Sequence, residues 1–109
     1  MNLRNGPAAL ALLTALFAGG AFAQAAAPQD MLYTRSLAAT CANCHGTAGQ
    51  AAAGSANATL AGRGKDDIVT QMKAFKSGAR PATVMHQLAK GYSDTQIEAI
   101  AAYFAAQKK

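Results

Sequence analysis

Hydrophobic and polar positions are most clearly ordered near the C-terminal end of the chain. Ser93 and Gln96 have the spacing of a capping box, in which each side chain bonds the backbone N–H of the other residue. Four apolar residues then follow at the spacing of one helical face: Ile97, Ile100, Ala101 and Phe104. The pattern predicts a closing helix with one buried side.

Two further helices are predicted upstream. Residues 29–40 contain several apolar positions and no Gly or Pro, which favours a helix that runs up to Cys41. A second helix is indicated by four apolar residues at helical spacing: Ile68, Val69, Met72 and Phe75. We expect Asp66 or Asp67 to cap this helix and Gly78 to end it.

The segments between these helices are predicted to be loops. Residues 46–64 are small or polar and show no periodicity, and so long a loop needs a surface to lie against. Pro81 disfavours helical backbone at Arg80, so we expect an extended loop over residues 81–86. No stretch alternates apolar and polar residues as a half-buried strand would. The predicted fold class is therefore all-α.

The N-terminal residues have the features of a secretory signal. Arg4 supplies a positive charge, residues 8–17 form a nearly unbroken apolar run, and Ala21 and Ala23 give the small-x-small pattern of a cleavage site. The apolar run is shorter than the ~20 residues that a membrane anchor needs. We expect residues 1–23 to be a signal peptide that is removed after Ala23.

Residues 24–109 are then expected to form one domain, periplasmic and without stable membrane insertion once the signal is removed. Cleavage after Ala25 is the alternative boundary. A domain this short buries only about 60 to 65% of its unfolded surface, and alanine makes up much of the chain's hydrophobic 51%. At this size, firm folding usually needs a disulfide, a metal or another internal support.

The charge of the chain is moderately basic, with a formal net charge of +5. Five basic residues lie in one stretch: Lys65, Lys73, Lys76, Arg80 and Lys90. Such a stretch steers encounters with an acidic-surfaced oxidase, reductase or flavoprotein, although ordinary solvated lysines explain it equally well. Nucleic-acid binding is not expected, because no basic run has interleaved aromatics.

The strongest chemical signal is the motif Cys41-Ala42-Asn43-Cys44-His45, which contains the only two cysteines of the chain. Two thiols at this spacing can each form a thioether to a haem vinyl group, which places the adjacent imidazole under the iron as an axial ligand. One covalently bound haem c would also supply the missing core.

Three other interpretations use the same residues. A thioredoxin-like redox pair needs a strand-helix-strand context, and none is visible. A structural zinc site needs four ligands, whereas the chain has two cysteines, His45 and the distant His86. A disulfide between Cys41 and Cys44 would close too short a loop to stabilise the fold much. Haem attachment is therefore favoured.

The motif near the start, a methionine-containing loop and a final helix with aromatics together resemble class I monohaem cytochromes c over nearly all of residues 24–109. Residues 74–80 and 83–93 are similar to the cytochrome subunit of flavocytochrome c sulfide dehydrogenases. The resemblance implies a cytochrome c fold of three to four helices around the haem. It also implies an axial methionine at the position of Met85.

From the residues alone, the second axial ligand is a methionine or a histidine on a loop that folds over the opposite face of the haem. Met72 has the spacing of a core residue, which leaves Met85 as the candidate ligand. The alternative is His86, the neighbour of Met85, which would give bis-histidine iron. Adjacent side chains of an extended loop point opposite ways, so we expect only one of the two to be the ligand. Coordination by His45 and Met85 implies a relatively high reduction potential.

Other residues have predicted supporting roles. Arg63 and Arg80 are candidates to pair with the haem propionates, or are simply exposed surface arginines. Leu60 is expected to pack on the haem, and Leu37 and Phe104 to join the first and last helices.

These observations predict periplasmic electron transfer. We do not expect an enzyme, because both axial positions of the haem iron would be filled. The alternative, implied by the resemblance, is a haem-bearing subunit that accepts electrons in a flavocytochrome c sulfide dehydrogenase complex. The flavoprotein would be another polypeptide, since the dinucleotide-binding fingerprint is absent. A third hypothesis is a haem enzyme or gas sensor from which Met85 dissociates.

Overall fold

The computed structural model describes residues 27–109, so the predicted signal peptide over residues 1–23 lies outside the described residues. The described part is helical and contains no strand, which confirms the all-α fold class. Its elements are α1 (Ala27–Ala39), α2 (Ala42–His45), the 3-10 helix η1 (Thr47–Gly49), α3 (Lys65–Ser77), α4 (Met85–Lys90) and α5 (Asp94–Ala105). Two of the five α-helices, α2 and α4, are short additions to the three predicted from the sequence.

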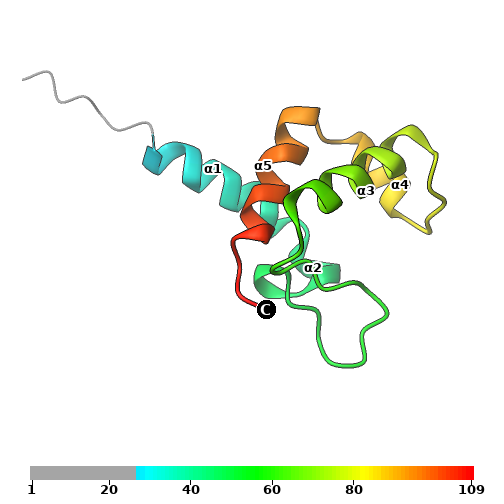
Figure 1. The fold of residues 1–109 in the computed structure, drawn as a ribbon, viewed down its shortest axis with the longest axis horizontal. Coiled ribbons are helices and arrows are strands. Elements are labelled where there is room, and N and C mark those ends of the chain that lie inside the picture. Colours follow the sequence, from blue (N-terminus) through cyan, green and yellow to red (C-terminus); the bar gives the residue numbers. More distant parts are fainter. Residues whose placement is uncertain (1–26) are drawn as a thin grey trace, which may run out of the picture.

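Helix α5 is the centre of the arrangement, since it packs against both α1 and α3, while α3 also packs against α4 (Figure 1). The predicted capping box is present: the Ser93 hydroxyl accepts from the Gln96 N–H at 3.1 Å, and the Gln96 side chain accepts from the Ser93 N–H at 2.9 Å. All four residues of the predicted apolar face are buried: Ile97, Ile100, Ala101 and Phe104. The closing helix is confirmed.

Helix α3 confirms the second predicted helix but not its cap. Ile68, Val69 and Met72 are buried, and Gly78 ends the helix in the left-handed conformation at φ 81°. The N-cap is Gly64, with no side-chain cap hydrogen bond, and Asp66 and Asp67 both lie inside the first turn. There the carboxylates still favour the helix by facing the positive end of its dipole.

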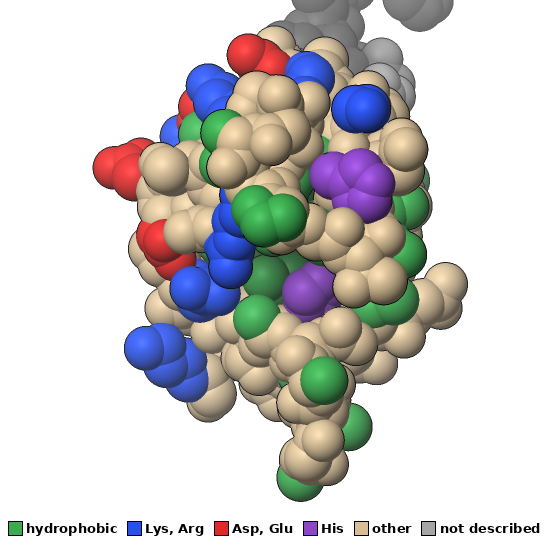
Figure 2. Space-filling model, turned by 90° about the vertical axis from the view of Figure 1, so that its right-hand side faces the viewer, with side chains coloured by type: hydrophobic (Ala, Val, Ile, Leu, Met, Phe, Trp, Pro, Cys, Tyr) green, Lys and Arg blue, Asp and Glu red, His purple; other side chains and the backbone are tan. Residues whose placement is uncertain are grey.

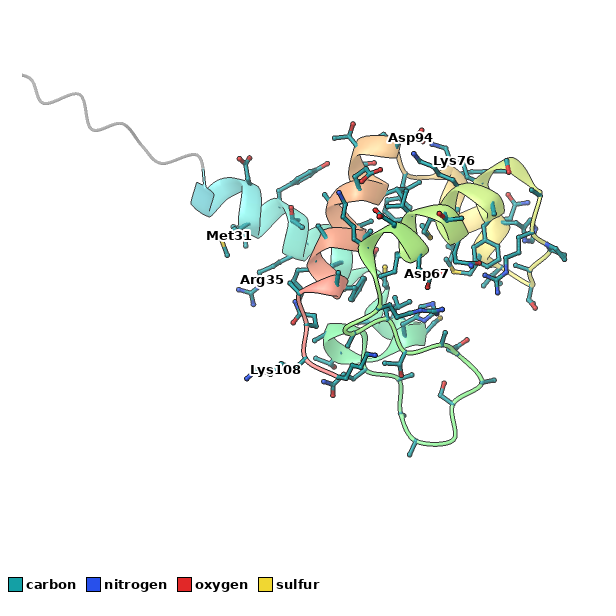
Figure 3. All side chains as sticks on the ribbon, viewed as in Figure 1. Met31, Arg35, Asp67, Lys76, Asp94 and Lys108 are labelled. Carbon is teal, nitrogen blue, oxygen red and sulfur yellow. The ribbon has the colours of Figure 1, made fainter. Side chains whose placement is uncertain are left out.

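Helix α1 confirms the first predicted helix and joins the core through its C-terminal half. Ala38 is buried, and Leu37 packs against the cluster that contains Phe104, as predicted. Further towards the N-terminus the helix is exposed, and Met31 projects away from the other helices (Figure 3). Among residues 27–109, no helix has both the length and the hydrophobicity to cross a bilayer.

The two ends of the loop over residues 46–64 lie against the last helix, whereas residues 52–59 between them are exposed. Gly49 is buried with φ +80°, and its Cα faces the ring of Phe104 so closely that a side chain would collide with it. The Gly49 carbonyl accepts from the Leu60 N–H at 2.8 Å and the Ala61 N–H at 3.1 Å, and the Gly62 N–H donates to the Phe104 carbonyl. The two ends of this loop therefore find their surface on α5.

The prediction of an extended loop over residues 81–86 is wrong at the C-terminal end of the loop, because α4 begins at Met85. The Leu88 N–H donates to the Val84 carbonyl at 3.1 Å, which is a helical hydrogen bond. Proline restricts only itself and the residue before it, so Pro81 does not prevent a helix four residues later. Met85 and His86 are therefore in the first turn of a helix and not in extended backbone.

Candidate functional site

The cysteine-histidine motif forms a tight turn directly after α1. Cys41 is the N-cap residue of α2, and its carbonyl accepts from the His45 N–H at 2.9 Å. Both thiols are free; Cys41 is half-buried and Cys44 is exposed. Burial raises the pKa of the Cys41 thiol, the Thr40 hydroxyl opposes this rise, and Cys44 adds to it.

The ring of His45 has a defined hydrogen-bond partner. Its Nδ1 lies 2.6 Å from the carbonyl oxygen of Ala58. A carbonyl only accepts, so Nδ1 carries the proton and Nε2 presents its lone pair. A metal-binding imidazole is usually oriented in this way by a second partner on its other nitrogen. Sequence reasoning missed Ala58, because a backbone carbonyl leaves no mark in the residue types.

A cavity of about 420 Å³ opens beside the motif. Cys41, Cys44, His45 and Met85 all line it, together with apolar side chains that include Leu60, Ile68, Met72, Phe75 and Leu88. Figure 2 shows hydrophobic side chains and a histidine within a hollow on this face, with Lys and Arg side chains to its left and at the top of the view. The volume lies in the range of cofactor sites, and two thiols, an imidazole and a thioether suit an attached haem, so the residues fit that group.

The two candidates for the second axial ligand differ in position. Met85 lines the cavity, whereas His86 is not among its lining residues. The Nδ1 atom of His86 is buried and has no hydrogen-bond partner among residues 27–109. Met72 also borders the cavity but is buried within α3, as expected for a core residue.

Both predicted propionate partners line the cavity, and each already has a contact. Arg63 forms an ion pair with Asp67, in which the guanidinium Nη2 lies 3.0 Å from Oδ2. The guanidinium carbon of Arg80 lies 4.7 Å from the centre of the Phe75 ring. These contacts hold both cationic groups near the cavity.

The predicted basic stretch is partly neutralised. Lys65 and Lys73 lie 2.9 and 3.8 Å from the carboxylate oxygens of Glu98, and Lys76 lies 2.8 Å from Asp94. The hydrogen bond and charge of Lys65 lower the pKa of Glu98. Three of the five basic residues are thus paired, which weakens the long-range field inferred from the sequence.

Comparisons with known proteins show the family to which the chain belongs. Residues 25–104 match the family described as cytochrome C oxidase, cbb3-type, subunit III. The chain is 41% identical to the cytochrome subunit of sulfide dehydrogenase of Chlorobaculum tepidum, over 62% of this chain and 60% of the relative. It is 35% identical to the thiosulfate dehydrogenase electron acceptor of Thiomonas intermedia, over 92% of this chain and 43% of the relative.

A third relative is cytochrome c4 of Pseudomonas aeruginosa, 36% identical over 89% of this chain and 48% of the relative. The chain therefore spans between 43 and 60% of the length of these three proteins. The family match covers most of the chain, and the motif has the spacing that covalent attachment of haem c requires. The chain belongs to the cytochrome c family, whose cofactor is covalently bound haem c.

Proposed function

We propose that this chain is a periplasmic electron carrier, and not an enzyme, with one haem c attached through Cys41 and Cys44 and axially ligated by His45 and Met85. The observation that carries the proposal is that all four side chains line one cavity, with Nδ1 of His45 bonded to the Ala58 carbonyl. Haem iron with both axial positions filled supplies one-electron chemistry.

The two cysteines support covalent attachment. Each free thiol can add its S–H across one vinyl double bond, which forms a thioether and consumes no oxidant. The half-buried position of Cys41 and the exposed position of Cys44 leave both sulfurs at the cavity wall. Attachment holds the cofactor in a chain whose buried core is rich in alanine.

Met85 is preferred to His86 as the second ligand because Met85 alone of the two borders the cavity. A thioether ligand favours ferrous iron, which gives a relatively high potential. Arg63 and Arg80 line the cavity, which supports their pairing with the haem propionates. Arg63 would then exchange or share its ion pair with Asp67.

Export rests on the signal peptide expected over residues 1–23. N-terminal sequencing of the protein secreted by a host with haem-ligation machinery is expected to begin at Gln24. Retention of Arg4 in the haem-bearing protein would contradict the proposed cleavage.

The ligation is tested by pyridine haemochrome analysis and by the optical spectrum of the ferric protein. One covalent haem per chain and a methionine-to-iron charge-transfer band are expected. Met85→Ala should abolish the band, while His86→Ala and the matched control Met31→Ala, whose side chain is 64% exposed, should keep it. Absence of the band in wild type, with a low-spin ferric spectrum that becomes high-spin in His86→Ala but not in Met85→Ala, would assign the ligand to His86.

A second candidate function is electron acceptance from a sulfur-oxidising dehydrogenase. It is favoured by the similarity to the cytochrome subunit of sulfide dehydrogenase and to the thiosulfate dehydrogenase electron acceptor of Thiomonas intermedia. The partner would be a flavoprotein or another oxidoreductase, and it would carry the catalytic site. Co-purification with such a protein and reduction of the haem on addition of sulfide or thiosulfate would support this role.

A further inference from the structure

A side-chain hydrogen bond connects the segment before Cys41 to the segment after α4. The Tyr92 hydroxyl lies 2.6 Å from Thr40 Oγ1, although 52 positions separate the two residues. Thr40 directly precedes Cys41, and Tyr92 follows the helix that begins with Met85. The bond therefore joins the attachment side of the cavity to the side that carries Met85.

The direction of this bond follows from its neighbours. Thr40 Oγ1 lies 2.7 Å from the Leu37 carbonyl, which can only accept, so Thr40 donates its single proton there. Tyr92 must then donate to Thr40. The Leu37 carbonyl, in the last turn of α1, also accepts from the Thr40 backbone N–H at 3.2 Å, so the Thr40 hydroxyl adds a second hydrogen bond to it. Hydrogen bonds in such a series strengthen one another.

Tyr92 is itself held in place from α3. Lys76 Nζ donates to the Tyr92 carbonyl at 2.7 Å and to Asp94 Oδ1 at 2.8 Å. Figure 3 shows Lys76 and Asp94 side by side where α3 and α5 meet. With its backbone fixed, the Tyr92 side chain can transmit a restraint from α3 and α5 to Thr40.

Both Thr40 and Tyr92 line the cavity. A group that fills the cavity would take water away from their hydrogen bond, which makes the bond stronger than at an open surface. We infer that Tyr92, through Thr40, is a positioning residue that keeps α4 and its Met85 against the haem. The inference rests on the proposed His45 and Met85 ligation.

The test measures how easily added imidazole displaces Met85 from the ferric holoprotein, followed through the charge-transfer band. Tyr92→Phe keeps the ring and removes the donor, and we expect imidazole to bind about two- to tenfold more tightly, the usual worth of one hydrogen bond. Thr40→Val should give the same change, Thr40→Ser should behave as wild type, and the double variant should be less than additive.

A matched control separates positioning from general stability. Gln96 donates to the Tyr33 hydroxyl at 2.8 Å, which also joins α1 to α5, but neither residue lines the cavity. Tyr33→Phe should lower the unfolding temperature without changing imidazole affinity. Equal imidazole affinity in Tyr92→Phe and wild type would overturn the positioning role. Absence of the charge-transfer band in wild type would instead overturn the proposed ligation, and the positioning role with it.

Discussion

Replacing Gly49 with alanine is expected to destabilise the protein strongly, because the added methyl group has no room. A Cβ atom at this position would lie 2.6 and 2.8 Å from two ring carbons of Phe104 and 3.1 Å from the Ala61 nitrogen. Phe104 is only 1% exposed, so its ring cannot move aside without disturbing the core. The backbone of Gly49 is also left-handed, at φ +80°.

Both effects act in the same direction. Left-handed backbone costs a non-glycine residue about 1 to 2 kcal/mol, and forcing extra atoms into a packed core costs about 1 to 3 kcal/mol. The expected loss is about 2 to 5 kcal/mol, a large part of the 5 to 15 kcal/mol by which domains are typically stable. Because the Gly49 carbonyl holds Leu60 and Ala61, the disturbance should reach Ala58 and the ring of His45.

The assay is urea denaturation of the holoprotein, compared with Gly54→Ala. Gly54 has nearly the same backbone, at φ +79°, but no atom lies within 4 Å of a Cβ placed there. The control should therefore lose only the backbone contribution, and adding Phe104→Leu to Gly49→Ala should recover part of the packing loss. If Gly49→Ala is no more destabilising than Gly54→Ala, the loop does not pack on Phe104 as described.

Three other changes have distinct expected results. Ser93→Ala removes the helix cap and should lower the free energy of unfolding by about 1 kcal/mol in urea denaturation. Lys76 lowers the pKa of Asp94, so the pair stabilises the fold above about pH 4 and loses this effect as the pH falls through the lower folded pKa. In thermal unfolding, Asp94→Asn should remove this part of the acid dependence, and salt should shrink the difference. The ferrous wild-type protein should not bind carbon monoxide, because Met85 occupies the second axial position, whereas Met85→Ala should bind it. Rapid binding of carbon monoxide by wild type would favour the hypothesis of a gas sensor from which Met85 dissociates.

Features governed by neighbouring residues could be predicted from the sequence. The capping box of Ser93 and Gln96 depends on residues three positions apart, and the apolar face that follows depends on helical spacing alone. The attachment motif is similarly local, since Cys41, Cys44 and His45 lie within one turn. Such patterns identified the helices of the core and one side of the cavity.

Helix starts without a polar side-chain signal were harder to place. Gly64 caps α3 even though Asp66 and Asp67 are better capping residues, because the helix begins two or three residues earlier than their positions suggested. Helix α4 begins at Met85, and its N-cap residue Val84 has an apolar side chain that cannot cap the helix. Nothing in these local sequences distinguishes the observed boundary from its neighbours.

Contacts between distant segments could not be read from residue types. His45 reaches a carbonyl 13 positions away, and Thr40 reaches Tyr92 across 52 positions. A glycine against a ring, such as Gly49 against Phe104, depends equally on how the chain folds back. The sequence predicted that the long loop needs a surface, but not which helix supplies it.

The closure of that loop by Gly49 has a use in protein engineering. The Gly49 carbonyl accepts from the N–H groups of Leu60 and Ala61. These hydrogen bonds hold the start of the projecting segment next to its end. The positions of these two ends therefore do not depend on the tip of the loop, where Ala53 and Gly54 are exposed. Lengthening a loop with fixed ends costs little conformational entropy. A peptide inserted at this tip could tether the protein to an electrode while leaving the helices undisturbed.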